Sequence, residues 1–127
     1  MENRIKNLQK FLNDQNLDAM IVTNPANIFY LIGVNNFDSE KGFLLLILKN
    51  KWLLISSLFY QNRINGVIPA ANVVYAPRGE SISENMAKMV GNKSSIGFER
   101  EDLSFARYEI FKKALRGKKI GSGFRNG

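Results

Sequence analysis

The sequence predicts an α/β domain built on a mixed sheet with helices on both faces. Three observations support this class: helix-patterned segments alternate with short apolar runs, two of the runs are joined by only three residues, and those two runs are apolar throughout. Short connections favour antiparallel neighbours, and runs without polar alternation are typical of strands covered on both faces. The length of 127 residues suits a single domain.

The chain begins with a predicted helix and a predicted strand. Residues 3–16 place Ile5, Leu8 and Leu12 at helical spacing, with polar residues opposite, which is typical of an amphipathic helix. Residues 19–23 then form a short apolar run bounded by polar residues, as expected of a buried strand. Together they form the first helix–strand unit of the predicted domain.

The stretch that follows, NPANIFYLIG, predicts one short helix between two changes of chain direction. Asn24 can cap the helix with its side-chain oxygen, and Pro25 fits the first turn, where a backbone N–H is not required. Gly33 permits the left-handed backbone conformation that ends many helices. We therefore expect this stretch to deliver the next loop to the end of a strand.

Two apolar runs, residues 43–48 and 52–56, are joined by Lys-Asn-Lys and predict an antiparallel hairpin inside the sheet. The tip of this hairpin offers Lys49, Lys51 and Trp52. These residues are either a turn followed by the first buried aromatic residue or a binding tip, and we favour the turn.

The second half of the chain continues the alternation of helices and strands. A short helix is predicted over residues 60–65 and a strand over residues 72–76. Ser81 and Glu84 have the spacing of a helix capping box, in which the two residues satisfy each other's backbone N–H groups. Met86 lies on the apolar face of the helix that follows, so we expect it in the core.

The last predicted elements are a strand, a helix and the start of another strand. Residues 95–98 form a short apolar run, and the helix that begins at Ser104 repeats aromatic residues at spacings of three or four. Ile120 is the expected start of a last strand. We expect the domain to cover residues 1–120, and residues 121–127 to be a tail or the start of a linker.

The composition excludes several kinds of active site and partner. There is no cysteine and no histidine, which excludes thiolate zinc sites and histidine-dependent catalysis within this chain. The net charge is +7, but Arg116, Lys118, Lys119 and Arg125 carry four of these charges, so a nucleic-acid-binding face is not required. No secretory leader and no apolar run near the about 20 residues of a membrane helix are found. These features predict a cytoplasmic protein without nucleic-acid or membrane partners.

Carboxylates are the remaining candidates for acid–base or metal chemistry. Glu99, Glu101 and Asp102 cluster directly after the predicted strand. They could bind a metal ion, but acids at the start of a helix are also stabilised by the helix dipole, and we favour the latter interpretation. Residue patterns alone therefore indicate an α/β domain without a self-sufficient active site.

A longer stretch, RIKNLQKFLNDQNLDAMIVTNPANIFYLIGV, resembles the amino-terminal domain of the creatinase/prolidase family, which includes the Xaa-Pro dipeptidases and aminopeptidase P. The most specific part is the Asn-Pro-x-Asn-Ile-x-Tyr-Leu-x-Gly motif at residues 24–33, and the pattern extends over residues 3–120. The resemblance implies a ribonuclease-H-like arrangement of strands.

In this family a larger catalytic domain follows and binds two divalent metal ions (Mn, Co or Zn) through two Asp, one His and two Glu. The resemblance therefore implies that this chain is not catalytic and holds no cofactor or metal. It also implies that the full-length parent is a metal-dependent Xaa-Pro dipeptidase or aminopeptidase.

The resemblance also implies partners and a site. In the family this domain contacts its own C-terminal catalytic domain, helps to form a homodimer and borders the active-site mouth, where short proline-containing peptides enter. By resemblance, the loop after Gly33 restricts substrate size. Its candidate residues are Asn35, Asn36, Phe37, Asp38, Glu40 and Lys41.

The sequence departs from the family after the second strand of the hairpin. Many relatives have Asp-x-Arg-Tyr there, whereas this chain has Ser57-Leu58-Phe59-Tyr60. Any role of that arginine is lost, and Phe59 adds an aromatic side chain that can contact another domain or a second copy. Two alternatives remain open: a catalytically inactive binding module with the same fold, and the amino-terminal domain of a creatinase-type amidinohydrolase.

Overall fold

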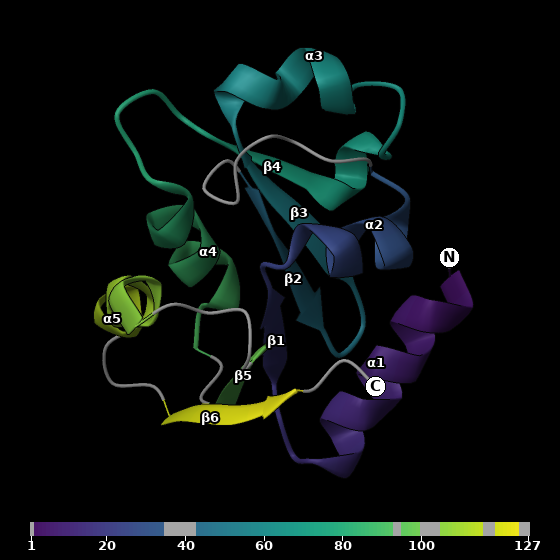
Figure 1. Cartoon of the computed structure of the whole chain (residues 1–127), viewed down its shortest axis with the longest axis vertical. Coiled ribbons are helices and arrows are strands. Elements are labelled where there is room, and N and C mark those ends of the chain that lie inside the picture. The colour runs from purple at the N-terminus through teal and green to yellow at the C-terminus, as the bar shows by residue number, and fades with distance from the viewer. Residues whose placement is uncertain (1, 35–42, 93–94, 100–104, 116–118, 125–127) are drawn as a thin grey trace.

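A computed structural model of the chain is shown in Figure 1. It describes residues 2–34, 43–92, 95–99, 105–115 and 119–124. The strands are β1 (Ala19–Val22), β2 (Phe43–Leu48), β3 (Trp52–Ser57), β4 (Val73–Ala76), β5 (Ser95–Glu99) and β6 (Lys119–Phe124). The α-helices are α1 (Glu2–Asp14), α2 (Pro25–Ile32), α3 (Gln61–Ile64), α4 (Ile82–Val90) and α5 (Phe105–Ala114). Two 3₁₀ turns, η1 (Leu58–Tyr60) and η2 (Ala70–Asn72), precede α3 and β4.

The strands form one mixed sheet in the order β4-β3-β2-β1-β5-β6. The hairpin strand β2 is antiparallel to both of its neighbours, whereas β3–β4, β1–β5 and β5–β6 are parallel pairs. Every described strand except β2 therefore runs in the same direction, and their carboxyl ends meet at one side of the sheet. We call this side the carboxyl edge; the start of β2 lies there too, because Phe43 pairs with Ser56.

Helices cover both faces of the sheet, as the sequence predicts. Alternate residues of β2 enter two separate core clusters: Phe43, Leu45 and Ile47 join the cluster beneath α1 and α2, while Leu44 and Leu46 join the cluster beneath α4 and α5. Figure 1 shows α4 and α5 on one side of the sheet and α1 and α2 on the other. All six residues of β2 are buried, which explains why this run lacks polar alternation.

The hairpin tip is held by contacts within the domain. The Gln9 side-chain amide in α1 donates a hydrogen bond to the carbonyl of Leu48 (3.0 Å), and the Lys49 ammonium lies 3.6 Å from the Asp18 carboxylate. Trp52 packs against the core cluster beneath α1. These contacts support the structural interpretation of the tip over a binding tip.

The C-terminal part of the sheet differs from the sequence prediction. Residues 121–124 belong to β6, so the expectation that the tail begins at residue 121 is wrong for these four residues. Strand β6 pairs with β5 along the main chain, with Gly97 opposite Gly121. Main-chain pairing requires no apolar side-chain pattern, which is why the glycine-rich composition did not indicate a strand. No helix in the described ranges is long and apolar enough to cross a membrane.

Candidate functional site

The loop predicted to restrict substrate size leads to the carboxyl edge. It follows α2 and leads into β2, whose first residue lies at that edge. The six predicted site residues, Asn35, Asn36, Phe37, Asp38, Glu40 and Lys41, lie outside the residues that the structure describes. The described residues show how both ends of the loop are held.

The start of α2 has the cap that the sequence predicts. The side-chain oxygen of Asn24 accepts a hydrogen bond from the backbone N–H of Asn27 (3.1 Å), and Pro25 occupies the first turn. Asn24 is in an extended conformation, as is typical of a capping residue. Local residues therefore cap α2 where it leaves β1.

A buried carboxylate reinforces this turn from the other side of the chain. Glu99, at the end of β5, is only 4% exposed. One of its oxygens, Oε1, accepts hydrogen bonds from the backbone N–H of Thr23 (2.5 Å) and of Asn24 (2.9 Å). The other oxygen, Oε2, accepts from the side-chain amide of Asn27. A negative group at this position also interacts favourably with the positive N-terminal end of α2.

This arrangement corrects the interpretation of Glu99 as an acid that starts the helix after it. The carboxylate stabilises the N-terminus of α2, which is more than 70 residues away in sequence, because β1 and β5 are neighbouring parallel strands. Glu101 and Asp102 lie outside the described residues. Within the described part of the chain, no group of three or more acidic side chains could hold a metal ion.

Both ends of the loop are fixed by described residues. Gly33 adopts the left-handed conformation (φ 73°), and its N–H donates to the carbonyl of Phe29 (2.8 Å), which ends α2 as predicted. Val34 is buried after it. On the far side, the buried ring of Phe43 meets the ring of Tyr60 edge-on, with 6.5 Å between centroids. The described residues on either side of the loop, Val34 and Phe43, are therefore both packed into the core.

Exposed aromatic and aliphatic side chains lie on the elements near the carboxyl edge. Phe59 is 77% exposed and stacks on Tyr60, with 5.3 Å between ring centroids. Leu58 and Phe29 are about half exposed. Tyr30 is also exposed, but the guanidinium of Arg4 lies 4.1 Å from its ring centroid. Phe59, which replaces an arginine of the family pattern, is thus available for contact with another surface.

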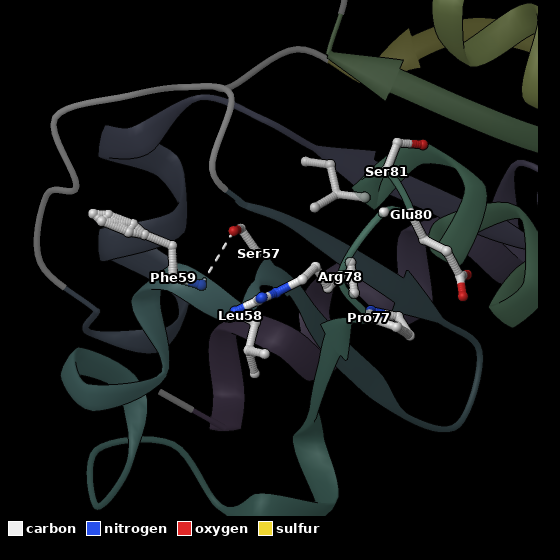
Figure 2. A pocket seen from close by; sticks show the side chains of 10 residues that line it. Ser57, Leu58, Phe59, Pro77, Arg78, Glu80 and Ser81 are labelled. Atoms are coloured by element: carbon white, nitrogen blue, oxygen red, sulfur yellow. Dashed lines mark hydrogen bonds between the residues drawn. The ribbon is translucent and has the colours of Figure 1, made fainter.

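A cavity of about 640 Å³ lies beyond the ends of β3 and β4. Its wall includes Ser57, Leu58 and Arg78 (Figure 2). The Lys88 ammonium hydrogen-bonds the Glu80 carboxylate at 2.7 Å, and this bond lowers the pKa of Glu80 and raises the pKa of Lys88. The sequence analysis did not single out Arg78. The only local signal was a cation inside a Pro-x-Gly turn that follows a predicted strand.

Comparisons with known proteins give a consistent result. A family model described as the creatinase/prolidase N-terminal domain matches residues 4–123. A Xaa-Pro dipeptidase of Lactobacillus helveticus is 28% identical over 124 residues, which cover 94% of this chain and 33% of the relative. The chain thus spans about a third of the length of this curated relative.

Two solved structures show the same fold. The creatinase/prolidase N-terminal domain of an X-Pro dipeptidase from Streptococcus pyogenes has a TM-score of 0.81 at 15% identity, covering 96% of this chain and 94% of that one. The N-terminal domain of the cytoplasmic peptidase PepQ from Mycobacterium tuberculosis has a TM-score of 0.78 at 20% identity, covering 98% and 93%. In both, a chain of similar extent forms the fold by itself.

Proposed function

The chain belongs to the creatinase/prolidase N-terminal domain family, and from this premise we propose that it is the non-catalytic domain of a Xaa-Pro dipeptidase-like metallopeptidase. The observation that carries the proposal is the match to a dipeptidase three times its length, in which this chain aligns with a single third. In the proposal, its partner is the catalytic domain of the same polypeptide. The description of PepQ as cytoplasmic supports a cytoplasmic location.

The described residues do not fit the two-metal site of the family. That site requires a histidine as well as several carboxylates, and this chain has no histidine. The buried carboxylate of Glu99 is already occupied by hydrogen bonds from the turn at Asn24. No chemical step is therefore assigned to these residues, and the metal ions belong to the catalytic domain in this proposal.

The role that we assign to the chain is control of access to the reaction centre. Asp38 and Glu40 lie in a loop whose two ends are fixed by Gly33 and Phe43. Two negative charges on this loop repel the terminal carboxylate of a peptide that reaches them and attract a cationic terminus. Such a loop discriminates between peptides by length, because only some lengths bring a charged terminus to it.

The experiment uses the full-length enzyme. We expect the coding sequence beyond Gly127 to encode its metal ligands, namely two Asp, one His and two Glu. Replacing Asp38 and Glu40 with Ala should change the ratio of kcat/KM between Xaa-Pro dipeptides and longer peptides by about fivefold to tenfold, as expected for loss of one to two charge contacts. The matched control replaces the exposed acids Asp14 and Glu109. An unchanged ratio would count against access control, and turnover of creatine instead of Xaa-Pro peptides would favour an amidinohydrolase.

The second assigned role is assembly. Phe59 and Phe29 expose apolar surface, and contact with a second copy or with the catalytic domain would bury it. Sedimentation of the full-length enzyme should show a dimer, and Phe59→Ser should raise its dissociation constant. A monomeric enzyme with full activity would contradict this assembly role. If the sequence beyond Gly127 lacked the metal ligands, the alternative of an inactive binding module would be favoured.

A further inference from the structure

Apart from Phe59, the residues that line the cavity at the ends of β3 and β4 have no role in the proposed function. These two strands are parallel neighbours, and their pairing ends at Ser57 and Ala76, which both line the cavity. The chain then crosses from β4 to α4 through the loop that contains Arg78. In sheets of this kind, ligands bind outside the carboxyl ends of parallel strands, so the cavity occupies an expected position for a ligand.

The charge of the cavity is not balanced within the described part of the chain. Arg78 is exposed, and no carboxylate among the described residues lies within ion-pair distance of it. Glu80 lines the same cavity, but Lys88 already holds its carboxylate at 2.7 Å. Figure 2 shows the Arg78 side chain extending toward Leu58, whereas Glu80 points away from it. The accessible charge of the cavity is therefore positive.

Besides the positive charge of Arg78, the cavity has a hydroxyl donor and an apolar wall. The hydroxyl oxygen of Ser57 accepts a hydrogen bond from the backbone N–H of Phe59 (3.2 Å), and its own hydrogen has no acceptor within the described ranges. Leu58 is 44% exposed at the cavity, and Ile82 lines it from the start of α4. The ring of Phe59 points away from Arg78 (Figure 2). A ligand that fits must combine an anionic group with a neighbouring apolar group.

We propose that this cavity binds the terminal carboxylate of a short peptide whose last side chain is apolar. The planar guanidinium of Arg78 can donate two parallel hydrogen bonds to a carboxylate, and the Ser57 hydroxyl supplies a third donor. Leu58 then contacts the apolar side chain. The choice of a peptide carboxylate rests on the proposed function, whereas the requirement for an anionic group beside an apolar one rests on the residues that line the cavity.

The test is an NMR titration of the ¹⁵N-labelled chain itself with N-acetyl-leucine, N-acetyl-leucine amide and acetate. We expect N-acetyl-leucine to shift the backbone signals of residues 57–59 and 78–82. The amide lacks the charge and acetate lacks the apolar group, so each should bind at least ~5-fold more weakly. Because the assay contains no catalytic domain, its result is independent of whether the full-length protein is a peptidase.

Variants identify the residue responsible. Arg78→Gln should weaken binding of N-acetyl-leucine by ~10-fold, and Arg78→Lys, which keeps the charge but loses the fork, by ~3-fold. Lys10→Gln removes one exposed charge from α1 and should leave binding unchanged. Equal binding of the acid and the amide would overturn the proposal. So would full binding by a folded Arg78→Gln variant, and acetate binding as tight as that of N-acetyl-leucine would overturn the peptide assignment.

Discussion

Two of the parallel strand pairs, β1–β5 and β3–β4, end in opposite ways at the carboxyl edge. Beyond β1 and β5, the Glu99 carboxylate is buried and accepts hydrogen bonds from Thr23, Asn24 and Asn27. Beyond β3 and β4, the corresponding space is a cavity, and Arg78 lies there exposed, without an ion pair among the described residues. Both pairs are parallel, and they differ in the side chains that lie beyond their ends.

At the same edge of the sheet, the residues beyond β1 and β5 contribute to stability, whereas those beyond β3 and β4 remain available for binding. Burying a carboxylate costs several kcal/mol unless its oxygens are hydrogen-bonded, so the Glu99 oxygens are used for contacts within the domain and not for a ligand. We call β1 and β5 the closed pair. Exposed charged groups lose little by remaining unpaired, because water solvates them. The β3–β4 pair, which we call the open pair, can therefore keep its donors for an external group, while the closed pair helps to position the start of α2.

The largest expected effect is the loss of the buried carboxylate. Glu99→Ala removes the acceptor of four hydrogen bonds, which come from the N–H groups of Thr23 and Asn24, the Thr23 hydroxyl and the amide of Asn27. We expect the free energy of unfolding to fall by about 3 kcal/mol. Arg78→Gln, at the open pair of the same edge, should change it by less than about 0.5 kcal/mol. Urea denaturation followed by circular dichroism measures both.

Conservative replacement sharpens this contrast. Glu99→Gln keeps the shape but turns one acceptor oxygen into an amide that faces other donors, so an intermediate loss of about 1–2 kcal/mol is expected. If Glu99→Ala were as stable as Arg78→Gln, the closed pair would not be a determinant of stability.

A smaller effect is expected at the point where the loop leaves the closed pair. Gly33 has φ 73°, and a Cβ built on it would meet no atom of the described residues within 4 Å, so we expect Gly33→Ala to cost mainly backbone strain, about 1 kcal/mol. Gly33→Asn should cost less, because asparagine tolerates this conformation better. Equal losses in the two variants, measured by thermal unfolding, would show that the backbone conformation is not the cause.

The sequence predicted the elements whose cause is local, and it failed where the cause is distant. The cap at Asn24 and the exit at Gly33 follow from neighbouring residues and were predicted residue by residue. Glu99 was noticed, but its partners lie over 70 residues away, across a pairing that no local pattern encodes. Residues 121–124 form a strand that pairs with β5, which their glycine-rich composition did not indicate. Arg78 gained significance only once β3 and β4 were placed side by side.

The smallest expected effect is the loss of the ion pair between Lys88 and Glu80, which lies near the ends of β3 and β4. The Lys88 hydrogen bond lowers the pKa of Glu80 in the folded chain, so its stabilisation is complete above the unfolded pKa and is lost as pH falls through the folded pKa. The stability difference between the wild type and Lys88→Met should therefore shrink as pH falls from 7 to about 3. Both groups are solvated, so the shift in urea midpoint should be far below that of Glu99→Ala. Lys51→Met, at an exposed position of the hairpin, is the control, and a difference that grew on acidification would mean that the ion pair is not its source.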